Sequence, residues 1–348
     1  MAIWSDYLTR KLIFEEHPNR CNDFCLDHIQ THTPCHRCEI ICPRQVFSSD
    51  PPAWGLCDGC GLCVSVCPSR CIAPAQIQAQ NLYERICRNR EHLLLSCSRQ
   101  TADTDGLVTC LASLPWELIA LAALNGHGVT LLKGPCSDCP MAPHMELFAQ
   151  SLDTLDEFFG SEFCDAHIRV TDSPEGTAQQ TYSRREAFQL FFSRSKQTAG
   201  QLLPSLESAV PDGTLWRQLL VRRLQSLPEP LPVQLPLPSF SDSCYGCTVC
   251  SSVCPSRAIH RIPDETHPDR VYLALIPWRC TGCGVCVQAC PAGALSAPAP
   301  RQTEDLTRPL LHRAPLSVCR KCGQPLPRPS FDGLCASCRG ITPDQLHW

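Results

Sequence analysis

The chain has 348 residues with 28 cysteines and 32 prolines, is 43% hydrophobic, and carries a formal net charge of −4. So many cysteines in so long a chain fit poorly with a small secreted disulfide scaffold, and their spacing in C-x2-C pairs favours metal binding. The net charge gives no electrostatic argument for a nucleic-acid partner. The first residues do not have the pattern of a signal peptide. The longest apolar run, residues 118–124, is too short to cross a bilayer. We therefore expect a cytoplasmic protein without a membrane span.

The first chemical signal is a group of cysteines in residues 21–75. A complete C-x2-C-x2-C-x3-C-P motif is formed by Cys57, Cys60, Cys63, Cys67 and Pro68. This spacing resembles bacterial-type ferredoxins, in which three closely spaced thiolates bind one [4Fe–4S] cluster and the fourth cysteine binds the cluster of the other half. The resemblance therefore implies a second half nearby.

That second half precedes the complete motif and lacks its first cysteine. The ligands present are Cys35, Cys38 and Cys42. His32 stands in the vacant position, but thiolate is the usual ligand of these clusters. We favour Cys25 as the missing ligand, with Cys21 and then His32 as alternatives. A three-cysteine site with a labile iron is the remaining possibility.

The crossing rule divides these cysteines between two sites. It assigns Cys25, Cys35, Cys38 and Cys67 to one cluster, and Cys57, Cys60, Cys63 and Cys42 to the other. Cys71 follows Cys67 at a position where the second ferredoxin segment has Ala258 and Ala294. We therefore interpret Cys71 as a small buried side chain.

The middle of the chain alternates predicted strands with predicted helices. The strands are predicted at residues 92–97, 107–110, 129–133 and 167–171, and the helices at 80–89, 115–125 and 143–159. Strands that alternate with helices indicate a small parallel sheet with crossover connections.

Cysteines follow the first three predicted strands of this segment. They are Cys97, Cys110, Cys136 and Cys139. The carboxyl ends of parallel strands meet at one edge of a sheet, so these thiols could hold a [2Fe–2S] cluster or zinc. Four ordinary core or loop cysteines are the alternative. The arrangement over residues 92–160 resembles the delta subunit of methyl-viologen-reducing hydrogenases, although the spacing of the last cysteine pair differs. That resemblance implies an electron-transfer module.

Residues 176–240 are predicted to connect this segment to a second group of cysteines. Helices are predicted at 183–200 and 214–225, and the proline-rich residues 227–238 are predicted to be extended. We prefer packed core helices to a docking surface for a partner subunit.

The second group contains two complete ferredoxin motifs. The crossing rule assigns Cys244, Cys247, Cys250 and Cys290 to one [4Fe–4S] cluster, and Cys280, Cys283, Cys286 and Cys254 to the other. Zinc or disulfides are the alternatives, which the register of eight cysteines and two prolines disfavours.

The C-terminal segment contains two further C-x2-C pairs, twelve residues apart. They are Cys319, Cys322, Cys335 and Cys338. This pattern resembles a zinc ribbon, in which four thiolates hold a tetrahedral metal and let a small domain fold. A single iron of the rubredoxin type uses similar ligands.

The sequence thus predicts an α+β, modular chain with two dicluster ferredoxin domains, a small α/β parallel-sheet domain between them, and a C-terminal zinc ribbon. The predicted boundaries are 1–78, 79–175, 176–240, 241–300 and 301–348. No role is assigned to Cys21, Cys71, Cys87 or Cys164.

The predicted function is one-electron transfer through at least four [4Fe–4S] clusters, as a subunit of an oxidoreductase complex. Partners of the hydrogenase, heterodisulfide reductase or molybdenum-enzyme type are implied by the resemblance. The alternatives are a catalytic subunit that uses the middle cysteines, and a redox sensor or assembly factor that acts through the zinc ribbon.

Overall fold

The computed structural model describes most of the chain between residues 18 and 340. The described ranges are 18–29, 35–74, 82, 85–86, 92–100, 106–125, 128–173, 215–234, 237–296, 301–302, 306, 308–316, 318–323, 326, 332–335 and 337–340. His32, Cys87 and the predicted helix 183–200 lie outside them, as does most of the predicted helix 80–89. No helix in the described ranges is long and apolar enough to cross a membrane.

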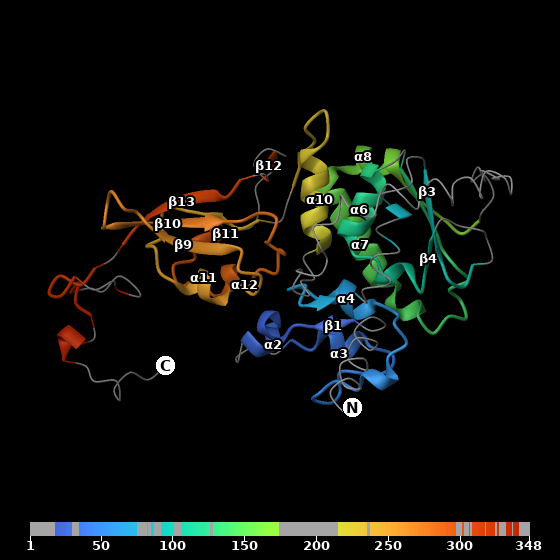
Figure 1. Ribbon diagram of the computed structural model, residues 1–348, viewed down its shortest axis with the longest axis horizontal. Coiled ribbons are helices and arrows are strands. Elements are labelled where there is room, and N and C mark those ends of the chain that lie inside the picture. The colour runs from blue at the N-terminus through green and yellow to red at the C-terminus, as the bar shows by residue number, and fades with distance from the viewer. Residues whose placement is uncertain are drawn as a thin grey trace, which may run out of the picture.

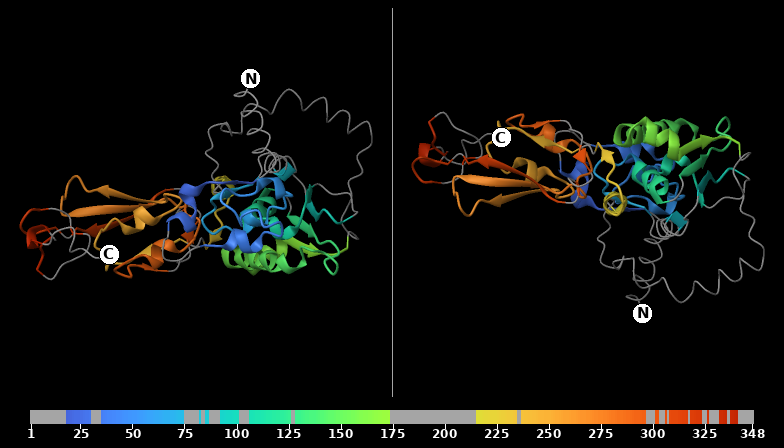
Figure 2. Two further views of the ribbon diagram at one scale, coloured as in Figure 1. Left: turned by 90° about the horizontal axis from the view of Figure 1, so that it is seen from below. Right: turned by 90° about the horizontal axis from the view of Figure 1, so that it is seen from above.

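The described elements form an elongated molecule. A parallel sheet lies at one end and the C-terminal cysteine segment at the other, with both ferredoxin units between them (Figures 1 and 2). One continuous core runs from Leu62 in the N-terminal unit, through the sheet domain, to Val271 in the second unit. A separate small core surrounds Cys63 and Cys67. The ferredoxin units therefore pack through a shared interior.

The N-terminal unit, residues 18–74, consists of short elements. They are β1 (Asn19–Arg20), η1 (Asn22–Phe24), α2 (Leu26–Ile29), α3 (Arg37–Ile41), η2 (Trp54–Leu56), α4 (Leu62–Val66) and β2 (Ile72–Ala73). The strands β1 and β2 pair antiparallel, with Asn19 opposite Ala73. A sheet of two strands with two residues each contributes little stability, so the stability of this unit depends on packing against neighbouring parts of the chain.

The middle domain contains the predicted parallel sheet. Its strands are β3 (Leu93–Cys97), β4 (Gly106–Val108), β5 (Val129–Leu132) and β6 (Ile168–Thr171). They are parallel in the order β4-β3-β5-β6. The helical segments are η3 (Leu111–Ser113), α6 (Trp116–Asn125), η4 (Ala142–His144), α7 (Met145–Phe159) and α8 (Ser161–His167). The prediction of a small parallel sheet with helical crossovers is confirmed; α8 was not predicted.

Helix α6 is buried on all sides. Nine of its ten residues are buried, including the charged Glu117. A helix that is apolar all round needs neighbours on every face. The sheet covers one side, and α10 (Leu215–Gln225) packs on another through Leu220 and Leu224, which are at most 1% exposed. The predicted helix 214–225 is therefore a core element.

The extended segment after α10 crosses the middle domain. Its strand β7 (Pro232–Val233) pairs with β12 (Arg301–Gln302), and the backbone N–H of Gln234 donates to the carbonyl oxygen of Phe158 at 2.9 Å. Val233 is buried against the shared core. These contacts connect the segment after α10 both to the middle domain and to the segment that follows the second ferredoxin unit.

The second ferredoxin unit has a sheet of its own. Strands β9 (Ile259–Pro263), β10 (Arg270–Leu275) and β13 (Leu310–Pro315) form an antiparallel sheet in the order β13-β10-β9. The remaining elements are β8 (Ser239–Phe240), α11 (Val249–Val253), α12 (Val285–Gln288) and β11 (Leu295–Ser296). Strand β13 comes from the segment predicted as part of the tail, and η7 (Ser337–Arg339) lies in that tail.

Candidate metal centres

All four ferredoxin halves build the same turn around their fourth cysteine. A short helix, α3, α4, α11 or α12, begins one residue before the third cysteine. The residue three places after the fourth cysteine is left-handed: Gln45, Arg70, Arg257 and Gly293 have φ of 53°, 55°, 50° and 58°. The repetition of an uncommon backbone conformation shows that each turn has the same task.

That task is to direct a backbone N–H group at the fourth sulfur. The N–H groups of Val46, Ala258 and Ala294 donate to the sulfurs of Cys42, Cys254 and Cys290 at 3.5, 3.2 and 3.3 Å. The N–H of Cys71 donates to Cys67 in the same way. Hydrogen bonds to ligand sulfurs stabilise thiolates and tune cluster potentials.

In the second unit, the structure brings cysteines of the two motifs together in two groups. Cys244, Cys247, Cys250 and Cys290 line one hollow together with apolar side chains such as Phe240 and Leu273. Cys254, from the first motif, interacts electrostatically with Cys280, Cys283 and Cys286 of the second. Each fourth cysteine is thus placed with the three cysteines of the opposite motif.

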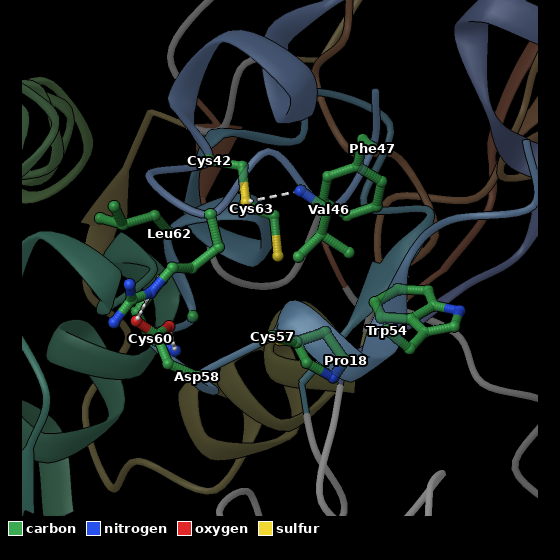
Figure 3. A pocket seen from close by; sticks show the side chains of 12 residues that line it. Pro18, Cys42, Val46, Phe47, Trp54, Cys57, Asp58, Cys60, Leu62 and Cys63 are labelled. Carbon is green, nitrogen blue, oxygen red and sulfur yellow. Dashed lines mark hydrogen bonds and ion pairs between the residues drawn. The ribbon is translucent and has the colours of Figure 1, made fainter. Parts of the chain in front are cut away.

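The complete motif of the N-terminal unit shows the same crossing. Cys42, Cys57, Cys60 and Cys63 line a hollow that is also formed by Val46, Phe47, Trp54 and Leu62 (Figure 3). Trp54 packs against the edge of Phe47, with ring centroids 5.6 Å apart. The apolar wall limits access of water to the sulfurs.

The incomplete motif brings five sulfurs together. Cys38 interacts electrostatically with Cys67, Cys25 and Cys35. Of the two candidates for the missing ligand that the structure describes, Cys25 is the one that interacts with Cys38. Cys21 donates its backbone N–H to the Cys71 carbonyl oxygen at 2.8 Å. The position of His32 lies outside the described residues.

The fifth sulfur belongs to Cys71. This residue is buried, as expected of a side chain in an alanine position, but its sulfur lies 3.5 Å from that of Cys67 and also hydrogen-bonds to Cys25. Hydrogen bonding from Cys71 lowers the pKa of Cys25 to about 6 and that of Cys67 to about 5. Cys71 therefore does more than fill space. The comparison of half-motifs missed it because Cys25 comes from outside the repeat.

These residues fit [4Fe–4S] clusters in their chemistry. Burial raises the pKa of Cys250 and Cys286 to about 12 and that of Cys60 to about 11. A buried thiolate is unfavourable alone, but positive iron deprotonates a coordinating thiol. Four sulfurs at each site, N–H donors at the fourth sulfur and apolar walls are the features that such a cluster uses.

The middle domain gathers its four cysteines at one sheet edge. Cys97, Cys110, Cys136 and Cys139 line one hollow, with Arg99 and Lys133 on its rim. The empty volume of this hollow, including its open side, is about 340 Å³, equal to that at Cys57 and Cys60. Hydrogen bonding from Arg99 lowers the pKa of Cys139. The hollow thus brings four thiols and two cationic side chains together at the sheet edge.

The C-terminal cysteines form a compact group. The sulfurs of Cys319, Cys322, Cys335 and Cys338 all lie within 4.8 Å of one another, and those of Cys322 and Cys335 are 3.7 Å apart. A tetrahedral ion with metal–sulfur bonds of about 2.3 Å requires sulfurs roughly 3.8 Å apart. The group could therefore bind a metal such as zinc. Among the described residues no other three potential ligands lie within 4.8 Å of one another, so the sulfurs of the middle domain and of the ferredoxin units are spread more widely than those of this group.

A further unassigned cysteine, besides Cys21, is Cys164 on α8. It is buried, and desolvation together with Asp156 raises its pKa to about 12. The groups that act on its thiol are the carboxylates of Asp156 and Asp165 rather than other cysteines, so no metal role is assigned to it.

Comparison with known proteins identifies two segments of the chain. Residues 243–294 match the family model of the 4Fe-4S dicluster domain, and residues 53–73 match that of the 4Fe-4S binding domain. The search of curated proteins found no match to the chain. The incomplete motif with Cys25, Cys35 and Cys38 lies outside both matched segments. The chain therefore contains ferredoxin-type iron–sulfur domains in each of its two cysteine-rich units, which suggests a role in electron transfer.

Proposed function

We propose that this protein transfers single electrons through four [4Fe–4S] sites as a subunit of an oxidoreductase complex. The observation that carries the proposal is the crossed grouping of cysteines in both ferredoxin units. When bound, each cluster accepts and releases one electron at a potential set by its surroundings. The reducing environment of the cytoplasm keeps the thiols available for iron.

The protein supplies the cluster ligands, shields them from water with apolar side chains, and brings the sites close to one another. Leu62 is fully buried beside Cys63, and Val285 is buried beside Cys286. The N-terminal unit also touches the middle hollow: a Cβ at Gly61 would lie 3.1 Å from Cβ of Ser113, whose hydroxyl donates to the Cys110 carbonyl oxygen at 2.7 Å. This contact supports a continuous route between the middle cysteines and the N-terminal sites.

The partner is proposed to be an enzyme of the hydrogenase, heterodisulfide reductase or molybdenum-enzyme type. The support is the arrangement of cysteines at the parallel-sheet edge, which resembles the delta subunit of methyl-viologen-reducing hydrogenases. In that role the middle site would hold a [2Fe–2S] cluster, and the C-terminal cysteines would hold zinc as a structural or docking element.

A second candidate function is catalysis at the middle hollow. Cys139 is partly exposed and its pKa is lowered by Arg99, which are properties of a reactive thiolate. Modification of Cys139 by a thiol reagent in the intact protein, with turnover that disappears in Cys139→Ser, would favour catalysis. Electron transfer alone predicts no turnover by the isolated chain.

The test of the main proposal is anaerobic purification with iron and sulfide analysis, followed by electron paramagnetic resonance of the reduced protein. Four clusters require roughly sixteen irons and sixteen sulfides in each chain, besides any in the middle domain. Fewer than about eight irons would overturn the four-cluster proposal. Purification of the native complex from its source identifies the partner, and a chain that always purifies alone would contradict the role as a subunit.

A further inference from the structure

A buried cluster of charges connects the two ferredoxin units through the middle domain. Glu117 on α6 lies between Arg70, which follows Cys67 in the N-terminal unit, and Arg217 on α10. The Arg70–Glu117 and Arg217–Glu117 ion pairs have nitrogen–oxygen distances of 2.9 and 3.4 Å. The side chains of Glu117 and Arg217 are each 2% exposed, so this charge cluster is shielded from solvent.

The charges in this cluster do not balance. Arg70 and Arg217 each carry one positive charge, whereas Glu117 supplies a single negative charge. Burial alone would raise the pKa of Glu117, but the attraction of both guanidinium groups outweighs it and keeps the carboxylate ionised. Arginine remains protonated in proteins, so the cluster has one excess positive charge. An uncompensated buried charge is unfavourable unless another charge faces it.

Arg217 also has unused hydrogen-bonding capacity. Its Nε and Nη1 atoms are buried and have no hydrogen-bond partner among the described residues. One face of the guanidinium stacks on Trp116, with Cζ 4.9 Å from the ring centroid. Arg70, by contrast, uses Nη1 to cap α4 at the carbonyl oxygens of Val64 and Ser65. The excess charge is therefore best assigned to Arg217.

The second ferredoxin unit supplies an acidic group that acts on the charge of Arg217. Besides Glu117, the group that attracts Arg217 is Cys280, which is itself buried. Cys280 belongs to the set with Cys254, Cys283 and Cys286. An iron–sulfur cluster held by four thiolates is negatively charged, and its net charge and hydrogen bonds to sulfur set its potential. A buried guanidinium with free N–H groups matches such a partner.

We propose that Arg217 is a positioning charge that raises the reduction potential of the site formed by Cys254, Cys280, Cys283 and Cys286, and that Glu117 partly offsets it. The inference rests on the proposed [4Fe–4S] sites. Reduction adds one electron, supplied by a one-electron donor, and makes the site one charge more negative without forming or breaking a bond. A fixed positive charge nearby stabilises the reduced form more than the oxidised form.

The experiment is a potentiometric titration of the whole protein, followed by electron paramagnetic resonance. The signal of this site is identified by its loss in Cys283→Ala. In Arg217→Gln, the ratio of reduced to oxidised site at a fixed potential should fall about tenfold, which corresponds to a midpoint about 59 mV more negative for a one-electron step. Arg217→Lys, which keeps the charge, should remain close to the wild type.

Glu117→Gln tests the direction in which the midpoint potential shifts. Removal of its negative charge should shift the same midpoint in the positive direction, opposite to Arg217→Gln. The matched control is Arg223→Gln on the same helix, because Arg223 donates to the Leu124 carbonyl oxygen at 2.8 Å and serves as a helix cap. Its midpoint should not move.

Shifts of equal sign in Arg217→Gln and Glu117→Gln would overturn the inference, as would equal midpoints in Arg217→Gln and Arg223→Gln. Should Arg217→Gln fail to bind iron, the comparison of Glu117→Gln with the wild type decides alone, because an unshifted midpoint there contradicts the inference. Failure of the proposed function is seen separately, as the absence of [4Fe–4S] signals in the wild type.

Discussion

The two ferredoxin units use the same ligand turn but are stabilised differently. The second unit has a three-stranded sheet of its own, in which β10 pairs with β9 and β13. In its described residues, the N-terminal unit has the two-residue strand pair β1–β2 as its sheet, and it packs Leu62 into the core of the middle domain. The family models match 243–294 as a dicluster domain but only 53–73 in the first unit. The comparison shows that local ligand geometry can persist while the surrounding scaffold changes.

The difference extends to the ligands themselves. The second unit has eight cysteines for two sites, whereas the N-terminal unit places a ninth sulfur, Cys71, against Cys25 and Cys67. Cys25 reaches its site from outside the motif, just before the short helix α2. The N-terminal unit thus combines a less regular ligand set with a spare thiol.

The largest expected effect comes from removing one cysteine in each unit. Cys250→Ala should lose a complete cluster, roughly four irons per chain, because the described residues that line its hollow offer no thiol besides its four ligands. Cys25→Ala should retain most of its iron, since Cys71 can take its place, and the double variant with Cys71→Ala should lose about as much as Cys250→Ala. Iron and sulfide analysis measures all three. Equal losses in Cys25→Ala and Cys250→Ala would contradict the spare-thiol interpretation.

The dependence of the N-terminal unit on the middle domain is tested by Glu117→Ala. This change leaves the buried guanidinium group of Arg217 and the partly buried one of Arg70 without their carboxylate, and it should cost about 3–5 kcal/mol in the free energy of unfolding. Urea denaturation followed by circular dichroism measures the loss. The control is Asp172→Ala, which breaks an exposed ion pair with Lys133 and should cost at most about 1 kcal/mol. Similar losses of unfolding free energy in both variants would argue against a stabilising role of the Arg70–Glu117–Arg217 contacts.

Substitution of two glycines tests how closely the cysteine motifs of the second unit pack against its sheet. Gly246 and Gly284 have φ of 68° and 75°, so alanine is strained at either position by roughly 1–2 kcal/mol. At Gly246 a Cβ would also lie 2.5 Å from Cγ1 of Val271 on β10, whereas at Gly284 it would meet nothing within 4 Å. Overpacking should add about 1–3 kcal/mol for Gly246→Ala. Equal thermal unfolding midpoints for the two variants would contradict the close packing of motif on sheet.

The smallest expected effect concerns the pH dependence of strand β13. Burial lowers the pKa of His312, which stacks on Phe240 with ring centroids 5.3 Å apart. The folded state therefore binds fewer protons than the unfolded state, and stability should fall as pH drops below the unfolded pKa of about 6.5. His312→Phe should flatten this dependence between about pH 7.5 and 5.5. Thermal unfolding at several pH values tests this, with the exposed His260→Gln as the control that should keep the wild-type slope.

Several features follow from local sequence. The cysteine spacing predicted the ligands. The turn that carries each fourth cysteine is also local, because the helix, the left-handed residue and the N–H bond to sulfur all lie within five residues of that cysteine, although its geometry was not predicted. The alternation of strands and helices predicted the parallel sheet, since a strand followed by a crossover helix constrains the next strand to lie parallel. The edge position of Cys97 and Cys110 followed from that topology.

Other features depend on contacts between distant segments. Nothing near Cys71 in the sequence indicates that Cys25 will lie against its sulfur, and β13 joins β10 across about forty residues. The charge cluster of Arg70, Glu117 and Arg217 spans three regions of the chain. In the sequence these residues resemble ordinary surface charges of helices and turns. Only the tertiary structure decides that they are buried, because burial depends on which elements pack around them. The cysteine pattern indicates where iron could bind, whereas the packing of distant segments sets which charges surround those sites.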